Sequence, residues 1–426
     1  MLDKIIDILK RTQELSGWKV IEDKTSAEEL FFIRDKIEMN RAKDVTAYHV
    51  ALYRDFDEKG VSMRGSADVA IHPSMSGEEM RSTIRQGLLG AGFVKNPWYP
   101  LVGKTGTCDA VRQESDLDAI AAGLGGLPHA GKSWLSTLEI FLNKTERRIV
   151  NSEGVDVAFA FPHGMLEMIA TSQGVKEEVE LFDDFRFSSV TTEKIMAAVD
   201  DLMRLVDERA DASPTPCVKE MPVILNGVPV PTFMHYFVSH SSAENKFKRH
   251  TTKEVGDRFT RDGDPGDPVT LRIDPLLPGA SNTLAYDRDG MRLEAVSLIE
   301  DGRLRRLWGD TRFSHYLKIE PTGGLTNVAF SPGDKTCDEL RASPCLELVS
   351  FSDFQMDPLT GDFGGEIRLG WHHENGKRKA VTGGSISGNM NDCGGRLMLS
   401  RETMLKDHYL GPQAVRMTGV NVAGVA

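Results

Sequence analysis

Apolar residues recur along the first half of the chain with two spacings, one typical of helices and one typical of strands. A spacing of three or four residues predicts a helix over residues 2–16 and a long amphipathic helix over 191–209. Ser76 and Glu79 form a capping box, which predicts a helix from residue 77 to about residue 89. The same patterns predict further helices over 115–124 and 133–143, and strands over 47–54, 66–72, 155–161 and 168–182.

The second half is richer in strands and glycines. A strand is predicted over residues 269–273. Two β-hairpins are predicted around the dipeptides Asp301-Gly302 and Asn375-Gly376, because both dipeptides favour tight turns between strands.

A proline-containing stretch at residues 210–216 interrupts both patterns, and we place a domain boundary there. The prediction is therefore an α+β protein with two domains. Residues 1–210 form an N-terminal α/β domain with a mixed sheet and helices. Residues 211–426 form a C-terminal domain dominated by antiparallel β-sheet.

Composition and charge narrow the class of protein. The chain has 426 residues, of which 40% are hydrophobic and 27% charged, as in a soluble globular protein of two or three domains. A net charge of -12 argues against nucleic acid or an anionic membrane as the main partner, since both attract clustered cations. No run of about 18 apolar residues is present, and the N-terminal segment lacks the features of a signal peptide. Five scattered cysteines favour free thiols in a reducing cytosol, so we expect a cytoplasmic protein.

The stretch from Gly126 to Ser133 matches the P-loop pattern GxxxxGKS, in which backbone amides and a lysine hold phosphates. Such a loop follows a buried strand and opens a helix. Here a helix is predicted before it, and Ser133 is predicted as the N-cap of the next helix. We therefore expect a linker between two helices, with a nucleotide-binding protein as the alternative.

The strongest chemical signal is the pair His235 and His240, which has the histidine spacing of a zinc peptidase motif with Tyr236 in place of the catalytic Glu. On a regular helix a step of five residues turns the side chain by about 140° beyond a full turn, so both rings reach one ion only if a π-bulge absorbs a residue. Glu244 follows His240 at i+4 and is a candidate third ligand or substitute general base. The alternative is two ordinary core or surface histidines without metal.

Other charged segments have simpler interpretations. His372 and His373 precede the Asn375-Gly376 turn and point to opposite faces of a strand, so we expect them at a solvated hairpin tip. The basic run at residues 246–250 is interpreted as a solvated helix face.

The chain resembles the TldD/PmbA family of metallopeptidase-like proteins, in which PmbA is also called TldE. The similarity runs from about residue 145 to the end and rests on short motifs in the family's order. These motifs are Asn151-Ser152-Glu153-Gly154, Tyr286-Asp287-Arg288-Asp289-Gly290, Leu298-Ile299-Glu300-Asp301-Gly302, Pro321-Thr322-Gly323-Gly324, Gly361-Asp362-Phe363-Gly364-Gly365 and Ile386-Ser387-Gly388-Asn389.

The resemblance implies a metal site in TldD-type members, where a helix carries HExxxH and a Cys near the C-terminus completes the site. The two His match His235 and His240, but Tyr236 replaces the Glu that removes a proton from metal-bound water. No Cys follows Cys393, and the region expected to supply the third ligand contains His408. PmbA-type members lack the motif, and the resemblance implies that they form a paired assembly whose closed chamber admits short or unfolded peptides.

Four functions remain open. The first is a PmbA/TldE-like subunit of a cytoplasmic metallopeptidase, a homodimer or a heterodimer with a TldD-type subunit, lacking full catalytic machinery. The second is an active zinc metallopeptidase with a rearranged site, in which His235 and His240 act with Glu244 or His408. The third is the P-loop nucleotide-binding protein. The fourth is a peptide-binding homodimer without chemistry.

Overall fold

The computed structural model of the protein places its described residues in three β-sheets and the helices that cover them. The description covers residues 1–34, 36–106, 117–124, 132–174, 177–217, 221–260 and 263–425. The N-terminal half holds the helices α1 (Leu2–Lys10), α2 (Gly77–Ala91), α3 (Leu117–Leu124) and α4 (Thr192–Ala210). Its strands are β1 (Gly17–Ile33), β2 (Lys36–Glu58), β3 (Val61–Ile71), β4 (Asn96–Pro97), β5 (Ser133–Asn151), β6 (Asp156–Gln173) and β7 (Glu178–Phe187).

The C-terminal half is rich in short strands. Its helices are α5 (Pro229–His240), α6 (Ala243–Phe247), α7 (Thr311–Leu317), α8 (Cys337–Leu340) and α9 (Met390–Cys393), followed by the 3₁₀ turn η1 (Gly394–Arg396). Its strands are β8 (Ser213–Pro214), β9 (Val223–Asn226), β10 (Leu271–Ile273), β11 (Val296–Glu300), β12 (Arg303–Leu304), β13 (Val328–Phe330), β14 (Cys345–Met356), β15 (Asp362–Glu374), β16 (Lys377–Thr382), β17 (Ser385–Asn389), β18 (Met398–Leu399), β19 (Thr403–Lys406), β20 (Tyr409–Pro412), β21 (Ala414–Met417) and β22 (Asn421–Ala423).

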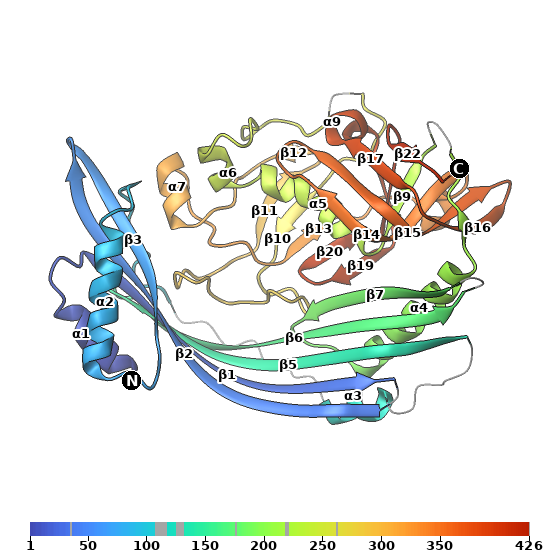
Figure 1. Ribbon diagram of the computed structural model, residues 1–426. Helices are drawn as coiled ribbons and strands as arrows, with labels where there is room; N and C mark the ends of the chain where they lie inside the picture. The colour runs from blue at the N-terminus through green and yellow to red at the C-terminus, as the bar shows by residue number, and fades with distance from the viewer. Residues whose placement is uncertain are drawn as a thin grey trace.

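A seven-stranded sheet in the order β4-β3-β2-β1-β5-β6-β7 dominates the N-terminal half. Every strand pair in it is antiparallel, so this sheet differs from the mixed sheet expected from the sequence. Figure 1 shows its long strands curving beneath the C-terminal half, with α1 and α2 at one end and α4 at the other. The α+β class itself is confirmed, since the fold combines helices with mostly antiparallel sheets.

The middle of strand β1 is polar, so the spacing of apolar residues does not predict this strand. Its charges are compensated across the sheet: Arg147 on β5 holds Asp23 through two hydrogen bonds of 2.7 and 2.8 Å. Arg41 on β2 donates to Glu29 at 2.6 Å, and Glu29 is only 2% exposed. Opposite charges on neighbouring strands stabilise a sheet, so the paired ions allow this charged segment to remain extended.

The prediction of a helix over residues 133–143 is wrong, because these residues lie in β5. A β-bulge between Leu135 and Thr137 inserts one extra residue against β6. The buried Leu135 and Leu138 are therefore three positions apart, a helix-like interval produced by a bulged strand. The boundaries predicted for the strands over 155–161 and 168–182 are also wrong. Residues 156–173 form the single strand β6, and β7 begins at Glu178.

The P-loop interpretation does not fit the described residues around it. Residues 126–131 lie outside the described part of the chain. Ser133 begins the strand β5 and not a helix, and its hydroxyl donates to Asp207 at 3.1 Å. A phosphate-binding loop needs a helix at this position, so the predicted N-cap role of Ser133 and the nucleotide site both lose their support.

The local helix signals were more reliable. Helix α2 begins with the predicted capping box, in which the Ser76 side chain accepts from the Glu79 amide. Helix α4 buries the predicted stripe of Ile195, Val199, Leu202 and Val206. Helix α1 ends at Lys10, well before the predicted residue 16.

The C-terminal half contains a six-stranded sheet, β12-β11-β10-β13-β20-β19, and a nine-stranded sheet, β18-β21-β9-β14-β15-β16-β8, with β17 and β22 attached through β15. Both predicted hairpins are present: Glu300 pairs with Arg303, and Glu374 pairs with Lys377. A core that includes Phe233 and Phe237 of α5 lies between these elements. The strands of the first sheet end at residue 187 and those of the other two begin at 213, while the domain boundary at residue 210 stays a prediction.

Contacts between the halves join distant segments. The Tyr316 hydroxyl of α7 donates to the Pro97 carbonyl at 2.6 Å, and Arg312 donates to Asn96 at 2.6 Å. At the other end, Lys406 contacts Asp183 of β7 at 2.6 Å. Within the described ranges, no helix has the length and apolar character needed to cross a bilayer.

Candidate functional site

Helix α5 carries the two predicted metal-ligand histidines and is built on a strand–turn–helix unit. Strand β9 is fully buried, Gly227 turns the chain with a φ of 70°, and Pro229 begins the helix, where its fixed φ is favourable and its missing amide costs nothing. One face of α5 packs into the C-terminal core. The buried residues of this stripe are Val230, Phe233, Met234, Phe237 and Val238.

This apolar stripe separates the two histidines. His240 lies seven residues after Phe233 and continues the stripe, so its side chain is buried with 8% exposure. His235 lies outside the stripe and is exposed. The helix is a regular α-helix throughout, without the π-bulge needed to bring positions five residues apart onto one face. The two rings therefore point in different directions.

His240 occupies a largely apolar site with one polar contact. Its Nδ1 lies 2.7 Å from the Thr251 hydroxyl, whereas its Nε2 is buried and makes no hydrogen bond of ordinary geometry to any described residue. Burial, and then the positive charge of Lys253, lower the pKa of His240 to about 4. The Pro358 carbonyl opposes this shift in part, and the imidazole is therefore neutral at physiological pH.

Tyr236 occupies the motif position of the catalytic Glu and packs its ring against His240. Its ring centroid lies 4.3 Å from that of His240 and 6.5 Å from that of Phe259. Burial, and then the nearby Cys393, raise the pKa of the Tyr236 hydroxyl. A neutral phenol cannot accept the proton from a metal-bound water as a carboxylate does, so Tyr236 does not replace the general base.

Cys393 is a neighbour of Tyr236 that the sequence does not indicate. It ends α9, is fully buried, and lies close enough to Tyr236 to influence its titration. Burial raises the pKa of the Cys393 thiol to about 12, so the thiol is protonated at neutral pH. Neither its sequence spacing nor a local motif indicates this contact, because α9 is about 150 residues from α5.

The two proposed third ligands lie apart from His240. Glu244 is on α6, where it forms an exposed 2.5 Å ion pair with Lys248. His408 lies near His235, and the pKa of His235 is lowered by desolvation and then by this second imidazole. The structure thus brings His408 to His235, but not to His240.

A zinc ion does not fit the described side chains as they stand. Among the described residues, no three His, Cys, Asp or Glu side chains converge to hold a metal, whereas zinc sites use at least three protein ligands. The His240 Nε2 is buried without a hydrogen bond of ordinary geometry among the described residues, and the ring that packs against this imidazole is that of Tyr236. The arrangement can hold a neutral imidazole and exclude water, but it supplies no carboxylate base.

A second cluster of buried ionisable groups lies at the hairpin of β15 and β16. His373 was expected at a solvated tip, but its side chain is only 13% exposed and its Nε2 lies 2.8 Å from Glu347. Glu347 is 1% exposed and also accepts from Arg341 at 2.6 and 2.8 Å and from Asn226 at 2.6 Å. The expectation failed because the partner comes from β14, 26 residues earlier in the chain.

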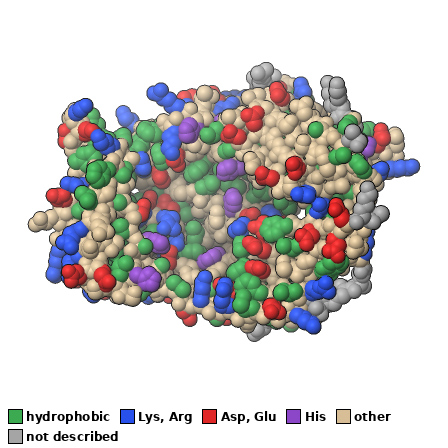
Figure 2. Space-filling model, viewed as in Figure 1, with side chains coloured by type: hydrophobic (Ala, Val, Ile, Leu, Met, Phe, Trp, Pro, Cys, Tyr) green, Lys and Arg blue, Asp and Glu red, His purple; other side chains and the backbone are tan. Residues whose placement is uncertain are grey.

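Figure 2 shows a hollowed face between the seven-stranded sheet and the C-terminal half, with histidine and charged side chains gathered in the hollow. This face combines polar groups from both halves of the chain. A ligand bound here would therefore contact both halves.

Sequence comparison matches the C-terminal half of the chain. A model of the PmbA/TldA metallopeptidase C-terminal domain matches residues 218–424. A zinc metalloprotease TldD homolog from Saccharolobus solfataricus is 26% identical over 200 residues, which cover 41% of this chain and 42% of that protein. The match therefore spans about two fifths of the length of that curated relative.

Structural comparison matches the whole chain. TldE from Thermococcus kodakarensis superposes with a TM-score of 0.78 and 16% identity, covering 99% of this chain and 100% of that one. A structure from Thermotoga maritima superposes with a TM-score of 0.76 and 15% identity over 100% of both chains. These low identities establish a common fold. The sequence matches place residues 218–424 in the TldD/PmbA family of metallopeptidase-like proteins, and the whole chain shares the TldE fold.

Proposed function

We propose that this protein is a PmbA/TldE-like subunit of a cytoplasmic metallopeptidase that processes short or unfolded peptides, and that it lacks full catalytic machinery itself. The observation that carries the proposal is the packing of Tyr236 against His240 at 4.3 Å, where an active site needs a carboxylate. The divergence of His235 from His240 on a regular helix supports the same conclusion.

The subunit in turn requires a partner that carries the metal and the general base. We propose a heterodimer with a TldD-type subunit, with a homodimer as the alternative. The TldE-like fold supports this choice, because fold and site together resemble the member of the family without the HExxxH motif.

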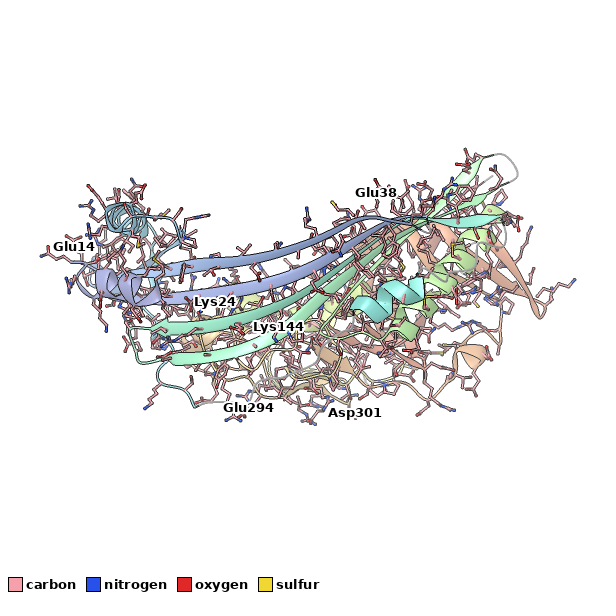
Figure 3. All side chains as sticks on the ribbon, turned by 90° about the horizontal axis from the view of Figure 1, so that it is seen from below. Glu14, Lys24, Glu38, Lys144, Glu294 and Asp301 are labelled. Carbon is pink, nitrogen blue, oxygen red and sulfur yellow. The ribbon has the colours of Figure 1, made fainter. Side chains whose placement is uncertain are left out.

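The outer half of β2 is the surface we propose for this partner. Residues 36–47 pair with β1 on one side, whereas β3 pairs with β2 only from Tyr48 onward, so within the described residues the other edge is free. The exposed apolar residues on this part of β2 are Ile37, Met39 and Val45, at 42–51% exposure. An exposed strand edge with apolar side chains is a template for strand addition. Figure 3 labels Glu38 at this margin of the sheet.

The proposal is tested by metal analysis and peptide cleavage with the purified chain, alone and mixed with a TldD-type protein bearing HExxxH. We expect less than about 0.1 zinc per chain and no cleavage by the chain alone, with cleavage only in the mixture. About one zinc per chain together with cleavage by the chain alone would refute the proposal.

The contact surface is tested by substitution in the same mixture. Ile37→Lys places a charge on the free edge and is expected to lower association by at least about tenfold, measured by analytical ultracentrifugation. Val61→Lys is the matched control, because Val61 is 55% exposed on β3 and away from this edge. Equal association of both variants would place the partner elsewhere.

The alternative is an active zinc metallopeptidase with a rearranged site. Two observations favour it: the buried Nε2 of His240, which makes no hydrogen bond of ordinary geometry to a described residue, and the proximity of Cys393 to Tyr236. If zinc is found, His240→Ala should leave the fold intact and abolish metal binding, while unchanged zinc in that variant would exclude α5 as the metal site.

A chain that binds peptides as a homodimer, without zinc and without stimulating any partner, would instead be a peptide-binding protein.

A further inference from the structure

A polar cavity lies where the seven-stranded sheet meets the start of α7, away from α5. Its volume is about 290 Å³, near the lower end for small-molecule sites. Lys19, Tyr53 and Asp68 line it from β1, β2 and β3, and Asp310 and Arg312 line it from the C-terminal half. The cavity therefore exists only because the two halves meet. Figure 2 shows acidic and basic side chains close together in the hollow between these halves.

Two buried tyrosines line this cavity without using their hydroxyls. Tyr53 is 7% exposed and Tyr99 is 8% exposed, and their rings make an edge-on contact at 6.5 Å. Within the described ranges neither hydroxyl makes a hydrogen bond, although both residues face a polar space. Neither hydroxyl oxygen is among the buried polar atoms without a partner, so both open on the cavity, where a bound molecule or water can pair with them.

The charges around Tyr53 are predominantly acidic. Burial, and then the carboxylates of Asp289 and Asp68, raise the pKa of the Tyr53 hydroxyl. Asp289 is neutralised by an ion pair with Lys19. Asp68 and Asp310 form no ion pair with any described residue. Burial raises the pKa of Asp310, and the hydrogen bond from the Phe313 amide and the nearby Arg312 only partly offset this shift.

Arg312 gives the cavity a cationic side. Its Nη2 donates to Asn96 at 2.6 Å, while its Nε is buried without a partner among the described residues. The cavity thus offers two carboxylates without an ion-pair partner among the described residues, two tyrosine hydroxyls and the guanidinium of Arg312. A metal ion is a poor occupant, because these carboxylates do not converge on a single point within the described chain.

We propose that this cavity binds the primary ammonium group of a small ligand, such as a peptide amino terminus or an aliphatic diamine. An ammonium has three donors that can reach separated acceptors, which suits Asp68, Asp310 and the Tyr53 hydroxyl. A ligand that also carries a carboxylate would place it against Arg312. The proposal does not depend on whether the protein acts in peptide cleavage.

Calorimetric titration of the full chain tests the site with three probes: glycylglycine, 1,4-diaminobutane and N-acetylglycylglycine. Saturable binding of glycylglycine is expected, with the acetylated peptide at least about tenfold weaker because it has no ammonium. Binding of the diamine alone would identify the ligand as a polyamine while supporting the ammonium site. Absence of saturable binding by both amines, or equal binding of the acetylated peptide, would overturn the proposal.

Substitutions then localise the binding. Asp310 caps α7 by accepting from the Phe313 amide at 2.8 Å, and Asn is an equally good cap, so Asp310→Asn removes charge while keeping the helix start. We expect it to weaken binding about tenfold or more, and Tyr53→Phe to weaken it about threefold.

Asp301→Asn is the matched control with the same change in net charge. Asp301 lies in an exposed hairpin turn with a φ of 49°, a conformation that Asn tolerates, and it is not among the residues that line the cavity. The control should bind as the parent does. If Asp310→Asn and Tyr53→Phe also bind as the parent does, with unchanged thermal unfolding, the ligand occupies another site and the proposal is wrong.

Discussion

The end of α5 and the hairpin of β15 both bury an ionisable side chain, but His240 at α5 is kept neutral whereas Glu347 at the hairpin is kept charged. At α5, His240 faces the Thr251 hydroxyl, the Pro358 carbonyl and the positive charge of Lys253, and its pKa falls to about 4. At the hairpin, Glu347 is surrounded by Arg341, His373 and Asn226. These partners outweigh the cost of burial and lower the pKa of Glu347 to about 2.

This difference shows that burial of a charge does not by itself mark a functional site. Glu347 is fully satisfied by the protein, so it acts as a structural link among β9, β14 and β15. His240 keeps a buried ring nitrogen without a hydrogen bond of ordinary geometry within the described chain, which costs stability. The incompletely satisfied group is therefore the better candidate for a former or shared metal site.

The largest expected effect is that of Glu347→Gln. The neutral amide leaves Arg341 and His373 without their carboxylate, and we expect a loss of roughly 3 kcal/mol in the free energy of unfolding. Urea denaturation at pH 7 measures this change. A loss below about 1 kcal/mol would mean that the Glu347 cluster is not the structural link described above.

The pH dependence of stability separates the two regions. The folded-state pKa of His240 lies below its ordinary value of 6.5, so unfolded chains bind the proton more readily and stability falls as pH drops from about 6.5 toward 4. Glu347 also has a lowered pKa, but its stabilisation is lost only as pH falls through 4.5 toward 2.

Between pH 7 and pH 5 the His240 contribution should therefore change by about 2 kcal/mol while that of Glu347 changes little. His240→Gln removes the titrating group, so urea midpoints of this variant should depend less on pH over this interval than those of the parent. An identical pH dependence would show that His240 is not buried in its neutral form.

A smaller effect is expected for His373→Ala. Arg341 and Asn226 still hold Glu347, so the loss in unfolding free energy should be about 1 kcal/mol, the usual value of one hydrogen bond. The measurement is again urea denaturation at pH 7. A loss as large as that of Glu347→Gln would indicate that His373, and not Arg341, is the main partner.

The smallest effect is expected for Glu244→Gln. Glu244 and Lys248 form an ion pair whose side chains are 45% and 47% exposed, so the change in stability should lie within about 0.5 kcal/mol. The variant repeats the chemical change of Glu347→Gln at an exposed position and serves as its control. Altered zinc content or altered peptide cleavage in this variant would instead restore Glu244 as a ligand or base.

Local signals account for the features that the sequence predicted correctly. The capping box of α2 and the buried stripe of α4 depend on residues within one or a few turns of each other. The hairpin turn at Asn375-Gly376 has φ angles of 52° and 70°, which this dipeptide adopts easily. The family motifs, the missing Glu at Tyr236 and the divergent spacing of the histidines were likewise visible in the sequence.

Contacts between residues far apart in the sequence determined the features that the sequence did not predict. The charged strand β1 and the bulged strand β5 follow from their neighbours, because cross-strand ion pairs and a one-residue shift override the local spacing. Packing of α5 against the core determines that His240 is buried and His235 exposed, and α9 brings Cys393 to Tyr236 from about 150 residues away. Local periodicity reports conformation over a few residues, whereas contacts between distant residues arise only when the sheets and helices pack around a common core.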